Sequence, residues 1–321
     1  MAKIFPDAGY YARVADATGF PVGPLETVFR LLDFLASVDP AVMARFALRG
    51  GTALNLAHLD MPRLSIDVDL DYVGTSDAET AATERPGILA SLRAAAHVAG
   101  YAVVDERLSY ALAHLRLGYR DAQGRPASIK VDVNFLDRVP ILPPVRAELR
   151  HPFSDDLAPL MLQTLDLPEL AAAKTVALAR RQAPRDLFDI ALLVQRDAVP
   201  WSLVRTLVVV RGAAYPPPSP AEYQAAAVDR VSTAAWRSEV VSLARRPLPV
   251  QIEEARAIGR GHLEQVASLE DSHLRFLRLL DQGHLRPELL ELDEGSRERV
   301  RRNPGLLWRL RTGPMGLEEE R

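Results

Sequence analysis

A short acidic strand behind a glycine pair constrains the fold of this chain most. Residues 65–72 read SIDVDLDY, so carboxylates alternate with apolar side chains. Side chains two apart on a β-strand share a face, which puts Asp67, Asp69 and Asp71 on one face and the apolar residues on the other. Three like charges on one face repel unless a cation, a ligand or water separates them. The segment is therefore either a cation-binding strand or a solvated edge strand.

The glycine pair precedes this strand by about fifteen residues. A short strand at 46–48 leads into Gly50-Gly51-Thr52, and Thr52 can cap a helix that runs to about residue 59. Glycines let the backbone approach a phosphate closely, and the N–H groups at the start of a helix bind anions. Many tight turns contain such a triplet, so it indicates a triphosphate site only in combination with the acidic strand.

A second strand repeats the alternation. Residues 128–135 read SIKVDVNF, which places Lys130 and Asp132 on one face. If the two strands are neighbours in a sheet, Asp132 joins Asp67 and Asp69 in a cluster of three carboxylates. Such hard oxygen ligands suit Mg²⁺ or Mn²⁺, which bridges to substrate phosphates. Two such ions would activate an attacking hydroxyl and neutralise charge on a leaving pyrophosphate.

A third group of charged residues lies farther along the chain. Lys174 falls on an expected helix at 168–182, and Asp186 and Asp189, three residues apart, share a face of the next helix at 185–195. Only three lysines occur among 39 basic residues, and two of them are Lys130 and Lys174. The alternative for this group is an ordinary helix start, in which Asp186 pairs with Arg181 or Arg185.

The order of expected elements gives an α+β (mixed α/β) fold, with a mixed sheet and flanking helices followed by an all-helical C-terminal domain. We expect two domains, at residues 1–150 and 151–321, the second of which contributes Lys174 and Asp189 to a cleft. Expected strands lie at 46–48, 64–72, 101–106, 110–119 and 127–136. Expected helices lie at 24–38, 52–59, 78–98, 168–182, 185–195, 200–211, 220–244 and 250–281.

The composition limits which kinds of partner the protein can bind and where in the cell it can act. The formal net charge is -3, so nucleic acid must be bound by a local patch rather than by the field of the whole molecule. Six arginines between residues 297 and 311 could grip an RNA backbone, and a solvated or partner-facing helix is an equal alternative. There is no cysteine, no apolar run long enough to cross a membrane, and no signal-peptide core at the start. We therefore expect the protein to be located in the cytoplasm. We expect His262, His273 and His284 at the surface.

These segments, in this order, resemble the AbiEii/MenT-type nucleotidyltransferase toxins of the DNA polymerase β-like nucleotidyltransferase superfamily. Gly50-Gly51-Thr52 with residues 65–69 resembles their first motif, and Lys130-Val131-Asp132 resembles the second. Residues 174–189 resemble the third and fourth. The resemblance spans about residues 48–195, and it implies a nucleotidyltransferase-like sheet.

The resemblance also implies roles for individual residues. Asp67, Asp69 and Asp132 would hold Mg²⁺ or Mn²⁺ and, with Lys174 and Asp189, would be the catalytic set. The implied nucleotide-binding residues are Gly50, Gly51, Thr52, Ser65, Lys130, Lys174, Arg185 and Asp186. The implied activity transfers a nucleotidyl group from an NTP to the 3′ end of tRNA, as the toxin of a toxin–antitoxin pair. A winged-helix, DNA-binding antitoxin would be its partner, and no membrane is involved.

Two other functions are compatible with the residues. One is nucleotidyl transfer to a small molecule or to a protein side chain. The other is a non-catalytic module of the same fold that binds a nucleotide or a partner. An acidic acceptor pocket without a basic surface for RNA would favour the former, and a toxicity that survives Asp69→Ala would favour the latter.

Overall fold

The computed structural model describes residues 5–153 and 157–312, which form two compact units. Unit 1 holds the described residues up to Arg138, those of Pro144–Leu165, and Ser242–Leu248. Unit 2 holds Val139–Pro143, Asp166–Val241 and the described residues from Pro249 onward. No helix within these ranges is both long and apolar enough to cross a membrane. The domain limits at residues 150 and 151 stay a prediction.

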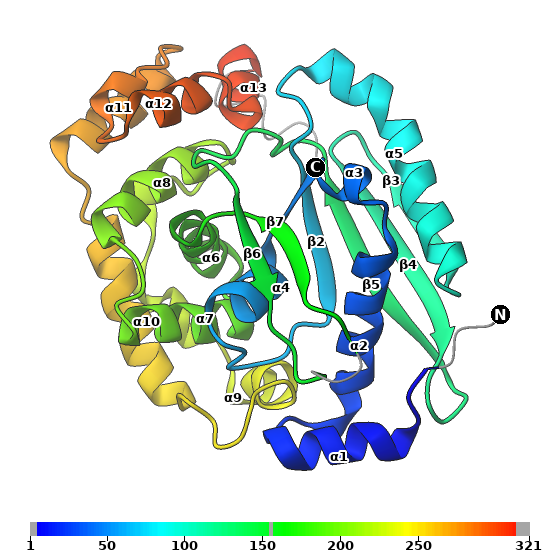
Figure 1. Cartoon of the computed structure of the whole chain (residues 1–321). Helices are drawn as coiled ribbons and strands as arrows, with labels where there is room; N and C mark the ends of the chain where they lie inside the picture. Colours follow the sequence, from blue (N-terminus) through cyan, green and yellow to red (C-terminus); the bar gives the residue numbers. More distant parts are fainter. Residues whose placement is uncertain (1–4, 154–156, 313–321) are drawn as a thin grey trace. The chain divides into compact units, whose positions relative to one another are not determined.

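Unit 1 is built on one mixed sheet (Figure 1). Its seven strands lie in the order β3-β4-β5-β2-β1-β7-β6, in which β2 is parallel to β5 and β1 is parallel to β7. The strands are β1 Phe46–Leu48, β2 Asp67–Tyr72, β3 Ala102–Leu108, β4 Leu112–Arg120, β5 Pro126–Asn134, β6 Val145–Leu149 and β7 Leu160–Thr164. The helices are α1 Ala8–Thr18, α2 Val22–Ser37, α3 Pro40–Met43, α4 Gly50–Thr52, the π-helical turn η1 Ala53–His58, and α5 Ala78–Val98.

Helices α2 and α5 cover one face of the sheet, and Figure 1 shows them beside its strands. The Thr27 hydroxyl on α2 lies 3.3 Å from the Tyr119 hydroxyl on β4, and Glu84 on α5 accepts a hydrogen bond from Tyr72 on β2. The face beneath these helices is the apolar one, with a fully buried core. From β2, β4 and β5 that core takes Val68, Leu70, Ala113, Leu115, Leu117, Ile129, Val131 and Val133. The alternating charged residues therefore point to the opposite face.

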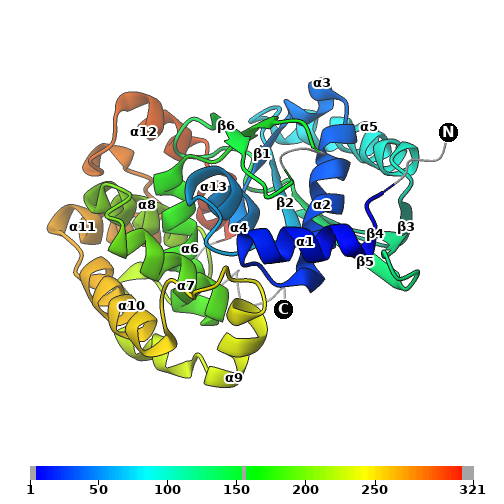
Figure 2. The ribbon, with the colours of Figure 1, turned by 60° about the horizontal axis from the view of Figure 1, so that its bottom comes forward.

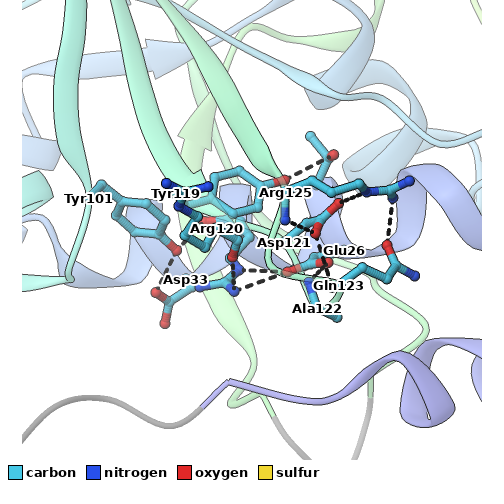
Figure 3. Close-up of polar contacts among 11 residues, drawn as sticks. Glu26, Asp33, Tyr101, Tyr119, Arg120, Asp121, Ala122, Gln123 and Arg125 are labelled. Carbon is cyan, nitrogen blue, oxygen red and sulfur yellow. Dashed lines mark hydrogen bonds and ion pairs between the residues drawn. The ribbon is translucent and has the colours of Figure 1, made fainter.

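A polar network ties the β4–β5 hairpin to α2 (Figure 3). Glu26 accepts a hydrogen bond from the main-chain N–H of Ala122 at 2.9 Å and pairs with Arg30 at 3.0 Å. The Tyr101 hydroxyl donates to Asp33 at 2.9 Å, and burial raises the pKa of Tyr101, which keeps the hydroxyl protonated. Because these buried partners are all satisfied, the hairpin is held in one register. That register determines what stands opposite each residue of β5.

Unit 2 is helical, as the sequence predicts, although several boundaries differ. Its helices are α6 Leu167–Arg181, α7 Pro184–Gln195, α8 Trp201–Ala213, α9 Thr233–Trp236, α10 Ile252–Ala267, α11 Asp271–Asp281, α12 Glu294–Arg301 and α13 Pro304–Thr312. Shorter turns are η2 Pro220–Glu222, η3 Ala225–Arg230, η4 Arg237–Val241 and η5 Pro287–Leu289. The helix expected at 220–244 is wrong, since short turns occupy that stretch. The helix expected at 250–281 is two helices, because the chain leaves helical geometry after α10.

The core of unit 2 includes the close approach of α7 and α10, which lie side by side in Figure 2. A Cβ on Gly259 of α10 would come within 2.5 Å of the Leu187 side chain on α7, so any larger residue here would require that side chain to shift. The expectation of surface histidines is wrong for two of three. His262 is buried against Thr175 at 2.8 Å, with burial lowering its pKa to about 4, and His273 is buried against Thr206 at 3.1 Å.

Two short segments belong to a different unit from the residues around them in the sequence. Leu243 accepts a hydrogen bond from the N–H of Leu64 at 2.8 Å, which anchors Ser242–Leu248 in unit 1. In unit 2, the buried Glu169 accepts hydrogen bonds from the N–H groups of Ile141 and Leu142 at 3.0 and 2.8 Å. The first segment is thus anchored by a bond between main chains, and the second by a buried carboxylate that accepts from main-chain N–H groups.

Candidate active site

The polar face of unit 1 brings together the charged residues of β2 and β5. The two strands are parallel, with Asp67 opposite Lys130, Asp69 opposite Asp132, and Asp71 opposite Asn134. Asp67 and Asp69 are half-buried, whereas Asp71 is only 1% exposed. The period-two alternation therefore placed Asp67, Asp69, Lys130 and Asp132 on one face of adjacent strands.

The glycine turn packs directly against this face. Gly50 has a φ of +69°, and a Cβ at this position would collide with the Asp69 carboxylate. A Cβ on Gly51 would lie 2.9 Å from the Ser65 hydroxyl oxygen. The buried Thr52 hydroxyl bonds to the main-chain oxygen of Asp67 and lies 3.0 Å from the Ser65 hydroxyl. Both glycines are thus required by close approach, and the turn is fixed beside the carboxylates.

The Asp132 carboxylate contacts two side chains, Lys130 and His114, and the sequence did not predict His114. Its Oδ2 lies 2.7 Å from Lys130 Nζ, and its Oδ1 lies 2.8 Å from Nδ1 of His114, which stands opposite it on β4. Burial works to lower the pKa of Lys130, but the hydrogen bond to Asp132 and the charges of Asp132, Asp67 and Asp69 outweigh it and raise that pKa. Lys130 is therefore a cation. Counting residue pairs back along β4 and β5 from the turn that joins them would have placed His114 opposite Asp132.

Asp71 differs from the other two aspartates of its strand. Its buried carboxylate lies 3.0 Å from Nε of Arg49, the residue just before the glycine turn. An ion pair of this kind offsets the cost of burying the charge. Asp71 is therefore an anchoring residue rather than an exposed member of the acidic cluster.

In unit 2, the predicted charged residues form a closed cluster. Lys174 Nζ lies 2.9 Å from Asp186 and 2.8 Å from Asp189, and both carboxylates are fully buried. Burial works to raise the pKa of Asp186, but the charge of Lys174 and the hydrogen bond from Arg181 outweigh it and lower that pKa to about 2. Arg181 contacts Asp186 at 2.7 and 3.1 Å, so the salt bridge of the alternative interpretation is present. Arg185 lies 3.7 Å from Glu239.

The arginines near the C-terminus have partners of their own. Five of the six contact a carboxylate or a main-chain oxygen within unit 2: Arg297 with Glu294, Arg299 with Pro140, Arg301 with Glu294 and Glu298, Arg302 with Glu298, and Arg309 with Asp281. These contacts favour a solvated, ion-paired surface over an RNA-gripping one. The remaining residue, Arg311, is exposed.

Comparison with known proteins decides the family. Residues 33–257, well over half of the chain, match the model of the nucleotidyl transferase AbiEii toxin family of type IV toxin–antitoxin systems. This chain is an AbiEii-family nucleotidyltransferase. MenT4, a nucleotidyltransferase toxin from Mycobacterium tuberculosis, has a similar fold, with a TM-score of 0.65 and 19% sequence identity over 94% of this chain and 99% of that one. No curated protein matches this sequence.

Membership of the AbiEii family establishes several of the expectations. The chain is a nucleotidyltransferase enzyme and the toxin of a toxin–antitoxin system, so an NTP substrate and an antitoxin partner come with the family. The mixed α/β fold is confirmed by the likeness to MenT4. The roles of individual residues, the acceptor and the kind of antitoxin stay predictions.

The AbiEii family generally uses a divalent metal, and the donor set on the polar face fits one in chemistry. Asp67, Asp69 and Asp132 supply hard carboxylate oxygens on adjacent strands, and the register sets Asp69 beside Asp132. Among the described residues, no three acidic or histidine side chains already stand at metal-binding spacing. At Asp132, Lys130 and His114 each contact one carboxylate oxygen. Each oxygen of this carboxylate keeps a further lone pair that could face a metal ion.

Proposed function

We propose that this toxin transfers a nucleotidyl group from an NTP to the 3′ end of tRNA, with Mg²⁺ or Mn²⁺ held by Asp67, Asp69 and Asp132. The observation that carries the proposal is the polar face of unit 1, where the glycine turn packs against Asp69 and the register of β2 and β5 sets Asp69 beside Asp132. The proposed phosphate-binding turn and the proposed metal-binding carboxylates thus lie on the same face of unit 1. Because NTP and tRNA occur in the cytoplasm, we place the activity there.

In this proposal, different residues bind the triphosphate, neutralise its charge and hold the metal. The turn at Gly50, Gly51 and Thr52, with Ser65, would receive the triphosphate, and Lys130 would neutralise its charge. When bound, the metal would polarise the phosphoryl group and stabilise the leaving pyrophosphate. In unit 2, the proposed contributors are Lys174, Arg185, Asp186 and Asp189, although Lys174 is already neutralised by two buried carboxylates.

A row of cations on the same face supports a nucleic-acid acceptor. We call Arg107, Arg116 and Lys130 the cationic strip. Arg116 stands opposite Lys130, and Arg107 stands opposite His114, so all of them share the face of Asp132. Arg107 is 78% exposed although it lies 3.4 Å from Asp105, and Arg116 forms no ion pair with any residue in the described part of the chain. Exposed arginines and lysines in a row bind phosphodiester backbones. The strip supplies the local patch that a chain of net charge -3 needs for RNA.

The test is a transfer assay with the full-length protein. Each of the four NTPs, labelled at the α-phosphate, is incubated with total tRNA and Mg²⁺ or Mn²⁺, with and without a chelator. We expect label in tRNA for at least one NTP, and we expect the chelator to abolish it. Label in small molecules or in protein instead would assign a different acceptor. No transfer from folded protein under any condition, together with unchanged toxicity of Asp69→Ala, would favour a non-catalytic module.

The antitoxin forms a second part of the proposal. The family implies one, and we propose a winged-helix, DNA-binding protein. Expression of such a protein, encoded beside the toxin, should restore growth of cells that express the toxin. If only unrelated proteins restore growth, the proposed antitoxin type is wrong.

A further inference from the structure

His114 is a residue of the polar face of unit 1 to which the proposed chemistry gives no role. It stands on β4 opposite Asp132 of β5, and Asp132 stands beside Asp69 of β2. Asp132 therefore lies between a histidine on one side and a second proposed metal ligand on the other. The register of the β4–β5 hairpin, which the network around Glu26 holds (Figure 3), is what sets the imidazole next to this carboxylate.

The contact between His114 and Asp132 is a hydrogen bond of defined direction. Nδ1 of His114 lies 2.8 Å from Oδ1 of Asp132, and Nζ of Lys130 lies 2.7 Å from Oδ2. An ionised carboxylate only accepts hydrogen bonds, so Nδ1 carries a proton and is the donor. With one donor on each oxygen, the carboxylate cannot rotate about its Cβ–Cγ bond without breaking a contact. Its orientation is thus set while each oxygen keeps a further lone pair.

The His114 ring is not part of the apolar core. Its side chain is 41% exposed, whereas that of Asp132 is 13% exposed. The adjacent residues of β4, Ala113 and Leu115, are buried on the opposite face of the sheet. Packing therefore does not require a histidine at this position, because substitutions at half-exposed positions usually cost little stability. What the histidine provides is the hydrogen bond to Asp132.

We propose that His114 is a positioning residue, which holds the Asp132 carboxylate in the orientation that a divalent metal ion requires. This inference rests on the proposed metal site of Asp67, Asp69 and Asp132. A donor behind a metal-binding carboxylate fixes the direction of its lone pairs, and loss of such a donor typically lowers metal affinity or activity by about 10- to 100-fold. Lys130 restrains the other oxygen and is also proposed to neutralise the triphosphate, so His114 is the partner that can be changed without altering that charge.

The experiment uses the full-length protein and measures its affinity for Mn²⁺ from the loss of the EPR signal of the free ion. In parallel, the Mn²⁺ concentration for half-maximal nucleotidyl transfer and the KM for the preferred NTP are determined. We expect His114→Leu to weaken Mn²⁺ binding by about 10- to 100-fold and to raise the half-maximal concentration by a similar factor. The KM at saturating Mn²⁺ and the Tm should stay close to those of wild type, because the change leaves the triphosphate-binding turn and the core intact.

Two further substitutions separate positioning from direct contact. The side-chain amide nitrogen of asparagine can take the place of Nδ1, and that of glutamine can take the place of Nε2. His114→Asn should therefore retain most of the Mn²⁺ affinity, whereas His114→Gln should lose as much as His114→Leu. If His114→Asn loses as much as His114→Gln, the ring acts through Nε2 on the metal or the substrate, and the inference is overturned.

The matched control is His97→Leu, which removes an exposed histidine from α5, the helix that covers the other face of the sheet. Its Mn²⁺ affinity should equal that of wild type. Failure of this inference and failure of the proposed site give different results. Wild-type protein that binds no Mn²⁺ overturns both. Wild-type protein that binds Mn²⁺ no more tightly than His114→Leu overturns only the positioning role of His114.

Discussion

Two groups of charged residues in this toxin have the same composition and opposite environments. On the polar face of unit 1, Asp67 and Asp69 are half-buried and Lys130 is 50% exposed. In unit 2, Lys174, Asp186 and Asp189 are all buried and satisfy one another at 2.8 to 2.9 Å. A half-exposed group can exchange its partners for substrate or metal, whereas a closed one must break strong contacts first. The comparison predicts that substitutions in unit 1 lower activity with little loss of stability, and that substitutions in the unit 2 cluster lower stability whether or not they also lower activity.

The largest expected effect tests the first half of this comparison. Asp69→Asn keeps the size of the side chain and removes its charge, so it should lower nucleotidyl transfer by about 10³-fold or more, with little change in Tm. Transfer of labelled nucleotide under single-turnover conditions measures the loss. Asp16→Asn, at an exposed position on α1, is the control and should retain full activity. A large drop in Tm for Asp69→Asn would mean that the unit 1 carboxylates are structural too.

The closed cluster of unit 2 gives the next effect. Lys174→Met removes the lysine from two buried carboxylates and leaves Asp186 with Arg181, which should lower the free energy of unfolding by about 3 kcal/mol in urea denaturation. Arg181→Gln removes a largely exposed partner of the same Asp186, so its cost should stay below about 1 kcal/mol. Lys174→Met with wild-type stability would break the comparison, because the buried cluster would then contribute little to the fold.

How well the sequence predicted this molecule depends on how local each signal is. Alternation along β2 and β5 has a period of two, and it was enough to place Asp67, Asp69, Lys130 and Asp132 on one face. The helix at Ala78–Val98 was equally well marked. Both patterns are written within a single element, and so a single sequence carries them.

Features that depend on distant pairing were not predicted. The burial of Asp71 requires Arg49, whose place beside it follows from the pairing of β1 with β2. Strands β6 and β7 are only five residues long each and lie among prolines, so the sequence predicts a domain limit there, at residues 150 and 151, and no strands. Helix α1 is not among the expected helices, and the stretch 220–244 has apolar residues at helical spacing yet forms short turns and the four-residue helix α9. These contacts join residues that are distant in the sequence and form only in the folded chain. The pattern within one segment therefore does not reveal them.

The pH dependence of the unfolding free energy gives a second test of the buried cluster in unit 2. The pKa of Asp186 in the folded protein is about 2, below its usual value of 3.8, so the folded state favours the charged form. The resulting stabilisation, about 2 kcal/mol, is complete above the usual pKa and is lost as the pH falls from about 4 towards 2. Urea denaturation at a series of pH values should show this loss in wild type. Asp186→Asn cannot titrate, so its unfolding free energy should depend less on pH in that window.

The smallest effect concerns the cationic strip of unit 1, where charges face solvent and each contributes little. Arg116→Gln removes one cation and should weaken tRNA binding only a few-fold at low salt, while reducing the slope of log Kd against log salt by about 0.7 to 0.9. Arg93→Gln is the matched control, because Arg93 lies on α5 and pairs with Glu106 on the opposite side of the sheet. Its salt slope should equal that of wild type. Equal slopes for both variants would show that the acceptor does not cross the strip, and would confine the role of the unit 1 face to the nucleotide.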